Sequence, residues 1–167
     1  RFVLPTEENK KDVLDFYEEF ENHDETCIGF ALYKDFSSWF TQMKNRKSGT
    51  NLPKGYVREN FYLCYENEKL IGVFSLKFEL TEYLFNFGGH IGYAVRPSMR
   101  NQGWATKILK QGLEVARDYK FKKLLVIVDE DNLPSIHVVL HNKGMLENTV
   151  YDSKEDVYVK RFWINIE

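Results

Sequence analysis

The residues whose types and spacing best suit chemistry form the segment Arg100-Asn101-Gln102-Gly103-Trp104-Ala105. This segment lies between a predicted strand and a predicted helix, so its main-chain amides converge at the positive end of the helix. Gly103 allows a ligand to approach the backbone closely, and Arg100 can add charge-assisted hydrogen bonds. The natural ligand of such a segment is an anionic phosphate. An ordinary strand-to-helix turn with polar surface residues would have the same composition.

The same segment resembles the pyrophosphate loop of the GNAT superfamily of N-acetyltransferases, which reads Arg or Gln, two residues, Gly, one residue, then Gly or Ala. Two flanking stretches extend the resemblance. Residues 88–97 (GGHIGYAVRP) resemble the strand before that loop in a bacterial branch of the superfamily, and residues 131–135 (DNLPS) resemble its Asn-x-x-Ser element. The likeness is strongest over residues 72–144 and extends through 146–148, whereas the first third of the chain matches in helix pattern only.

The resemblance implies an α+β fold (an α/β mixed sheet) in which a splayed central sheet is flanked by helices. The sheet would open in a V between the strand ending near Val95 and the strand at residues 124–128, and pantetheine would insert there like a missing strand. The implied activity is transfer of an acetyl group from the co-substrate acetyl-CoA to a primary amine by direct attack, without a metal. The implied cofactor-binding residues are Val95, Arg96, Arg100, Asn101, Gln102, Gly103, Trp104, Ala105, Thr106, Asn132 and Ser135.

Acetyl transfer needs a neutral amine, a donor for the developing oxyanion and often an acid for the departing thiolate. The main-chain amide of Val95 is the candidate oxyanion donor, because a splayed strand leaves it unpaired. His90 is the candidate base: it stands where similar sequences carry Glu, and its ordinary pKa of about 6.5 suits proton removal near neutrality. A histidine packed or hydrogen-bonded in the sheet is the alternative. Glu79 and Asp129 are weaker candidates that could act through water.

The acid of the reaction has no single candidate. Many relatives carry Tyr seven residues after the motif Asn, but the residue at that spacing from Asn132 is Val139. By the resemblance Ser135 could act near the thiolate instead, or it could bind backbone amides in the first turn of a helix. Tyr93 and Tyr151 are aromatic alternatives that could equally be core or wall residues.

The elements that must position these residues follow from the hydrophobic periodicity. Helical spacing predicts two helices near the start of the chain, one beginning after Thr6 and one capped by Asp35. Apolar runs predict antiparallel strands at 61–65 and 70–80, joined by the turn 66–69, and a strand at 90–95 that Pro97 ends. An apolar helical stripe over 105–119 and a buried strand at 124–128 predict a βαβ unit with parallel strands. A short helix at 134–142 and a hairpin of 146–151 with 157–166 follow.

Composition limits the class of protein. The 167 residues suit one domain, predicted to span 1–167, and the 43% hydrophobic share is enough for a sizeable core. A formal net charge of -2 provides no basic face for nucleic acid. No apolar run is long enough to cross a bilayer, and Cys27 and Cys64 form no zinc or disulfide pattern, so we expect a cytoplasmic protein without membrane or metal partners. The chain also lacks the GxxxxGKS/T and GxGxxG signatures of nucleotide hydrolysis and dinucleotide redox chemistry.

The sequence does not name the acceptor amine. An acidic cluster within residues 18–25 could attract a cationic amine or be a solvated helix end. Residues 44–58, with five basic residues and no carboxylate, could contact an anionic substrate or the cofactor, or form a polar loop. Two classes of function stay open, a working N-acetyltransferase and a non-catalytic acyl-CoA-binding sensor module. The last strand's Tyr158, Phe162 and Trp163 could form a homodimer interface or belong to an ordinary sheet.

Overall fold

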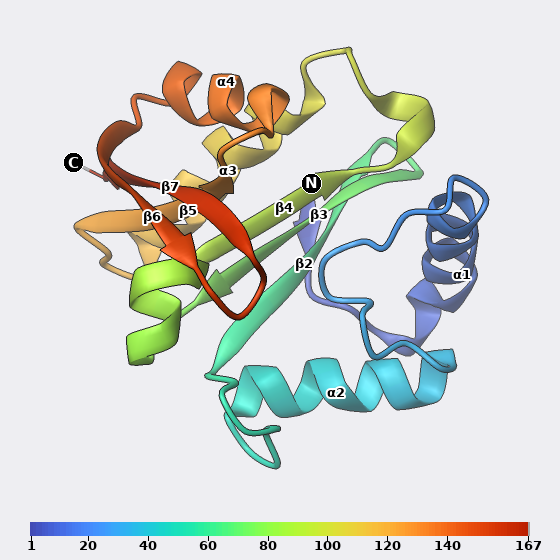
Figure 1. Ribbon diagram of the computed structural model, residues 1–167. Coiled ribbons are helices and arrows are strands. Elements are labelled where there is room, and N and C mark those ends of the chain that lie inside the picture. The colour runs from blue at the N-terminus through green and yellow to red at the C-terminus, as the bar shows by residue number, and fades with distance from the viewer. Residues whose placement is uncertain (167) are drawn as a thin grey trace.

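The computed structural model describes residues 1–166, and Glu167, the last residue of the predicted domain, lies outside the described residues. The chain forms two antiparallel sheets flanked by helices (Figure 1). The first sheet has the order β1-β2-β3-β4 and the second has the order β5-β7-β6. The strands are β1 (Phe2–Val3), β2 (Glu59–Glu66), β3 (Lys69–Lys77), β4 (Ile91–Val95), β5 (Lys123–Asp129), β6 (Met145–Asp152) and β7 (Val157–Asn165).

Four α-helices flank the sheets, and short helical turns join several elements. The α-helices are α1 (Lys10–Glu21), α2 (Phe36–Ser48), α3 (Trp104–Asp118) and α4 (Leu133–His141); the turns are η1 (Glu7–Asn9), η2 (Leu84–Gly88) and η3 (Pro97–Met99). The predicted helices and strands are all present. The sequence patterns did not predict β1 or the π-helical turn η2, because two and five residues are too few to show a period.

Strands β2 and β3 read as nearly continuous apolar runs because both faces of their sheet are covered. Tyr62, Cys64 and Phe74 point into a core shared with α3, α4 and the second sheet. Phe61 and Val73, which alternate with them, point into an aromatic core under α1 and α2. The first sheet is therefore the middle layer between two cores, and β4 lies at its edge.

Local signals position α2 as predicted. The Asp35 carboxylate accepts a hydrogen bond from the Ser38 amide at 2.8 Å, which caps the start of the helix. Gly49 ends it in the left-handed conformation, with φ of 74°. The helix thus begins and ends at residues whose side chains, or lack of one, satisfy its free backbone groups.

The predicted strand-helix-strand unit of β4, α3 and β5 is present, and its two strands do not pair along their length, as the V implied by the family resemblance requires. Gly89, two residues before β4 begins, forms one isolated bridge of the antiparallel pattern with Val126 of β5, and beyond it β4 and β5 belong to different sheets. Gly89 permits this approach because its φ is +74° and a Cβ there would lie 2.7 Å from the Leu125 carbonyl oxygen. From this contact the strands diverge, so continuous pairing between them cannot form.

Candidate functional site

The edge of β4 that faces away from β3 is unpaired. The Lys77 amide donates to the His90 carbonyl at 2.7 Å, and the Arg96 amide donates to the Ile71 carbonyl at 2.9 Å. Hydrogen-bonded residues alternate along an antiparallel strand, so the main-chain groups of Tyr93 and Val95 point to the other side. On that side β5 pairs with β7 instead. The divergence of the two sheets therefore leaves a free backbone edge, as a splayed sheet requires.

The turn into α3 carries a second set of free backbone groups. Asn101 and Gly103 both have positive φ, 60° and 80°, and Gly103 is the N-cap of the helix without a side-chain cap. Within residues 1–166 the amides of residues 101–106 donate to no acceptor in the protein. A cluster of such donors at a helix N-terminus is a strong site for an anion.

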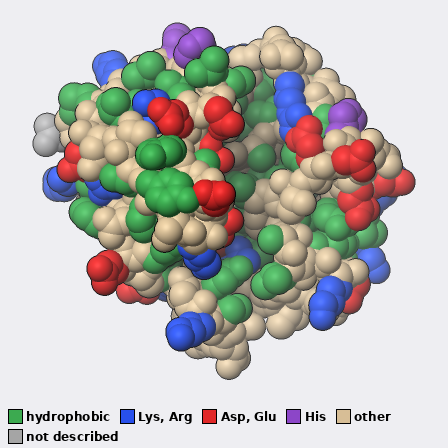
Figure 2. Space-filling model, viewed as in Figure 1, with side chains coloured by type: hydrophobic (Ala, Val, Ile, Leu, Met, Phe, Trp, Pro, Cys, Tyr) green, Lys and Arg blue, Asp and Glu red, His purple; other side chains and the backbone are tan. Residues whose placement is uncertain are grey.

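A cleft of about 560 Å³ joins the free edge of β4 to these amides. The space-filling view shows the surface hollowed between the two halves of the molecule, with charged side chains along the rim (Figure 2). Most of the predicted cofactor residues line the cleft: Val95, Arg100, Asn101, Gly103, Trp104, Ala105, Thr106, Asn132 and Ser135. Gln102 and Arg96 do not. The structure thus brings together segments from β4, α3 and α4.

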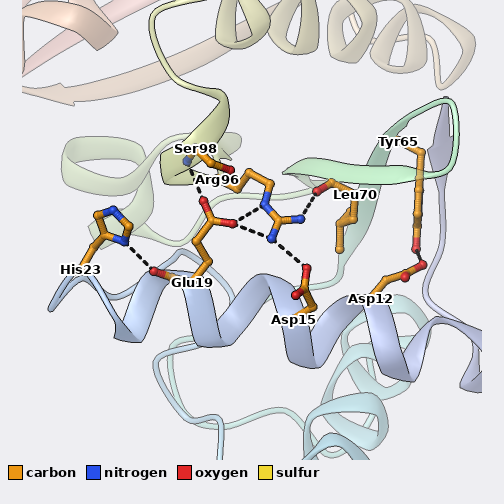
Figure 3. A network of polar contacts seen from close by, with 8 residues as sticks. All are labelled: Asp12, Asp15, Glu19, His23, Tyr65, Leu70, Arg96 and Ser98. Atoms are coloured by element: carbon orange, nitrogen blue, oxygen red, sulfur yellow. Dashed lines mark hydrogen bonds and ion pairs between the residues drawn. The ribbon is translucent and has the colours of Figure 1, made fainter.

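The Arg96 side chain points away from the cleft and holds α1 against the turn after β4 (Figure 3). Its guanidinium is buried and donates to Glu19 at 2.6 Å, to Asp15 at 2.8 Å and to the Leu70 carbonyl at 3.0 Å. The other oxygen of Glu19 accepts from the Ser98 amide. Burial opposes ionisation of Glu19, but the hydrogen bonds from Ser98 and Arg96 outweigh it and lower the pKa of this carboxyl. Arg96 therefore positions the turn rather than contacting a ligand in the cleft.

Arg100 is held at the rim of the cleft by a partner that the sequence did not predict. Its two terminal nitrogens donate to the two carboxylate oxygens of Glu25 at 2.8 and 2.6 Å, and its Nε donates to the Val95 carbonyl at 3.3 Å. The hydrogen bond from Arg100 lowers the pKa of Glu25. Glu25 itself lines the cleft. No sequence signal links these residues, because they lie 75 positions apart.

Tyr93 and Ser135 form a hydroxyl pair inside the cleft, with their oxygens 2.7 Å apart. Asn132 caps α4 by accepting from the Ser135 amide at 3.3 Å, which orients this turn. Burial raises the pKa of Tyr93 although the hydrogen bond to Ser135 opposes the change. The phenol is therefore a neutral donor near neutral pH. The side chain at the usual tyrosine spacing, Val139, is fully buried in the core.

The structure does not bring His90 into the cleft. The ring is half-buried between the two sheets, and its Nδ1 accepts a hydrogen bond from the Leu125 amide at 2.8 Å. Its Nε2 then carries the proton, so neither nitrogen has a free lone pair for a substrate. Burial, together with the charge of Lys77, lowers the pKa of His90 to about 4. This geometry favours the structural alternative over the predicted role as base.

The other candidates also lie outside the cleft. Glu79 and Asp129 are exposed and do not line it. Tyr151 is exposed on β6 and donates to Asp156. Phe162 packs in the core while Tyr158 is exposed, so an interface made by this strand stays a prediction. Within residues 1–166 no cluster of His, Cys, Asp or Glu is arranged to hold a metal, and none of the helices combines the length and apolar character that a membrane crossing needs.

A splayed sheet whose free strand edge leads to an open helix N-terminus defines an acetyltransferase fold of the GNAT type. The chain belongs to the acetyltransferase (GNAT) family, because the family model matches residues 4–144. The family resemblance and the fold class expected from the sequence are therefore confirmed.

Several solved structures share the fold. A variant of spermidine N-acetyltransferase from Vibrio cholerae is 15% identical with a TM-score of 0.69, over 99% of this chain and 95% of that chain. A Salmonella typhimurium acetyltransferase that modifies the N-terminal serine of a 50S ribosomal subunit protein is 15% identical with a TM-score of 0.70, over 99% and 94%. A Salmonella typhimurium protein solved with its cofactor acetyl-CoA is 11% identical with a TM-score of 0.67, over 100% and 94%. Identities this low show the fold alone. A comparison with curated proteins gives no match.

Proposed function

We propose that the protein is an acetyl-CoA-dependent N-acetyltransferase that moves an acetyl group to a primary amine. The observation that carries the proposal is the junction of two sets of free backbone groups, the edge of β4 and the amides of residues 101–106, along one cleft. One set suits an extended chain of amides and the other suits a diphosphate, and pantetheine diphosphate has both parts in that order. The neighbour solved with acetyl-CoA supports the same cofactor.

The residues present fit this cofactor. A Cβ built on Gly103 would meet no protein atom within 4 Å, so the space before the α3 amides is open to a phosphate. Arg100 already lies at the rim and can transfer one of its hydrogen bonds from Glu25 to a phosphate oxygen. The free main-chain groups of Tyr93 can pair with a pantetheine amide as a neighbouring strand would, and the Val95 amide is left for the acetyl group.

The chemistry is direct transfer. The amine nitrogen forms a bond to the acetyl carbonyl carbon, the carbon–sulfur bond breaks, the sulfur leaves with the electron pair and is protonated, and the nitrogen loses a proton to solvent. In this proposal the Val95 amide stabilises the oxyanion, which is supported by a strand register that turns its N–H away from β3 and by the place of Val95 in the cleft wall. The Tyr93–Ser135 hydroxyl pair can donate the proton or hydrogen bond that the departing sulfur needs.

The cofactor site is tested by calorimetry of acetyl-CoA binding. Gly103→Glu puts a carboxylate and a side chain in front of the α3 amides and should abolish binding. Gly55→Glu is the matched control, because Gly55 also has positive φ, 87°, and open space at its Cβ. Full affinity in the Gly103 variant would place the cofactor elsewhere and defeat the proposal.

The catalytic part is tested by thiol release from acetyl-CoA with a panel of amines. Tyr93→Phe should lower kcat by roughly tenfold to a hundredfold while acetyl-CoA affinity stays within twofold, because the lost hydroxyl acts on the leaving group. Ser135→Ala should act in the same direction. An unchanged kcat in both variants would remove the hydroxyl pair from the mechanism.

A non-catalytic acyl-CoA-binding module is the second candidate. It is favoured by two observations, the buried Val139 at the usual tyrosine position and the absence of a free lone pair on His90. Tight acetyl-CoA binding without thiol release from any amine would support it. We also propose a cytoplasmic location, which suits Cys27 and Cys64, both free and buried thiols.

A further inference from the structure

A second cavity of about 400 Å³ lies beside the first half of β4, on the face of the sheet that α2 covers. Its wall includes Ile91 and Gly92 of β4, whereas Tyr93 and Val95 line the cofactor cleft. The loop 22–35 also touches both spaces, with Glu25 in the cleft and Ile28 in the cavity. The cavity therefore reaches the same strand as the reacting end of the cleft, from the other side.

The polar wall of this cavity carries an excess of positive charge. Glu59 is only 5% exposed and accepts from Arg46 at 2.7 Å, with the Lys77 ammonium 3.3 Å from its other oxygen. Two cations thus share one carboxylate. The remaining charge is +1, and both oxygens of the buried acid are already engaged.

Arg46 has unused hydrogen-bond donors in this wall. The residue is 8% exposed, and within residues 1–166 its guanidinium makes one hydrogen bond, to Glu59, and lies 4.9 Å from the ring centroid of Tyr56. A guanidinium has five N–H donors, and a buried one with free donors is a site for a carboxylate or a similar anion. The Ser75 side chain adds a hydroxyl to the same wall.

We propose that this cavity binds the acceptor amine and that the acceptor carries a carboxylate group. The proposal rests on the proposed N-acetyltransferase function and adds its substrate class. Arg46 and Lys77 bind the carboxylate, and the apolar part of the wall takes a hydrocarbon portion; it consists of Ile28, Val57, Phe61, Leu84, Ile91 and Ile127. A polyamine fits this cavity poorly, because its cations would meet a net positive charge and an acid already paired twice.

Matched small probes test the charge preference directly. We would titrate 4-methylpentanoate, 4-methylpentanamide and isopentylamine, which share the hydrocarbon and differ in charge, and follow binding by protein NMR. The carboxylate should bind at least tenfold more tightly than the amide, and the amine should bind most weakly. Equal affinity for the three probes, tighter binding of the amine, or no binding of the carboxylate at millimolar concentration would overturn the proposal.

A Lys77→Gln variant identifies the cavity as the place of binding. It removes one positive charge and leaves the Arg46–Glu59 pair intact, so the fold should be kept. Affinity for the carboxylate probe should fall about tenfold while that for the amide stays within twofold. Lys110→Gln, the same change at an exposed position of α3, is the matched control and should alter neither. Equal losses in both variants, or none in Lys77→Gln, would contradict the proposal.

Two further measurements separate this proposal from the proposed function. Saturating coenzyme A should leave the carboxylate probe bound, because the two spaces are distinct; displacement would place the probe in the cleft and overturn the inference alone. Thiol release should favour L-leucine over L-leucinamide by tenfold or more. Equal rates with the two amines would also overturn the inference and leave the proposed function standing. Failure of acetyl-CoA to bind in calorimetry would instead defeat the proposed function.

Discussion

Acid should weaken this fold through His90 in a way that can be measured against a single substitution. The folded protein holds the pKa of His90 at about 4, against 6.5 for the free side chain. Between these values the unfolded chain binds a proton that the folded protein does not, so stability is complete above pH 6.5 and falls as the pH is lowered towards 4. In the neutral ring Nδ1 accepts a hydrogen bond from the Leu125 amide. Protonation places an N–H on Nδ1, so two donors face each other and this hydrogen bond is lost.

The size of the effect follows from the pKa. Each tenfold change in proton affinity is worth about 1.4 kcal/mol, so a fully dry ring would lose about 3 kcal/mol. The ring of His90 is half-buried, and solvent screening reduces this to about 1–2 kcal/mol. A loss of this size is a large fraction of the stability of a typical domain.

His90→Asn provides the comparison, because its side-chain oxygen can accept from the Leu125 amide but does not titrate. Urea unfolding of both proteins should be measured at half-unit steps from pH 8 to pH 4. All other groups titrate in both proteins, so the difference between the two stability curves isolates His90. That difference should be constant above pH 7 and should change by about 1–2 kcal/mol by pH 4, with the wild type losing more.

Parallel curves would refute the assignment of the pKa and of the hydrogen bond. His90→Phe gives the companion result: it removes the acceptor and leaves the Leu125 amide unpaired, so it should cost about 1–3 kcal/mol above pH 7, and this cost should shrink towards pH 4 because only the wild type loses stability through His90. Activity separates the two roles of this residue. His90→Asn should keep the turnover of the wild type at pH 8 if the ring is structural, and should lose most of it if the ring is the base.

Three further substitutions test the surroundings of the cleft. Gly103→Ala should lower the unfolding free energy by about 1 kcal/mol, because a residue in the left-handed conformation gains a Cβ. The control Gly55→Ala has the same conformation and should lose a similar amount. Glu25→Gln should free Arg100 and tighten acetyl-CoA binding several-fold in calorimetry at low salt; weaker binding would mean that Glu25 orients Arg100 rather than competing for it. Arg96→Met should destabilise the protein by about 3 kcal/mol in urea, because Glu19 loses its buried partner, and a change below 1 kcal/mol would contradict that role.

The elements of the fold could be predicted because their signals are local. Helix α2 has its cap and its apolar stripe within its own residues, and the hairpin of β2 and β3 turns at Asn67, which has a φ of 52°. The hydrophobic periods do not show whether β4 and β5 pair, and only the family resemblance implied the V between them. A strand, a helix and a second strand are the same sequence pattern whether the strands pair or diverge, and here they diverge beyond the contact at Gly89.

The candidate site also combines features set by one short segment with features set by residues far apart in the sequence. The amides of residues 101–106 belong to one short segment, so their convergence follows from the order of strand, glycine and helix. The roles of side chains depend on partners far along the chain. Arg96 and Arg100 are four residues apart and have the same side chain. Arg96 donates to carboxylates of α1, whereas Arg100 donates to Glu25 at the cleft.

The local pattern of this chain was therefore sufficient to indicate its family, its helices and strands, and the free backbone amides of residues 101–106. Those features depend on neighbouring residues and on the direction of the main chain. Tertiary contacts assigned the rest: the His90 ring to the Leu125 amide, Tyr93 to Ser135, and Arg46 and Lys77 to one buried acid. Burial and the distances between remote segments decide which polar groups are paired and which stay free to bind. The spacing of residues in the sequence does not show these distances.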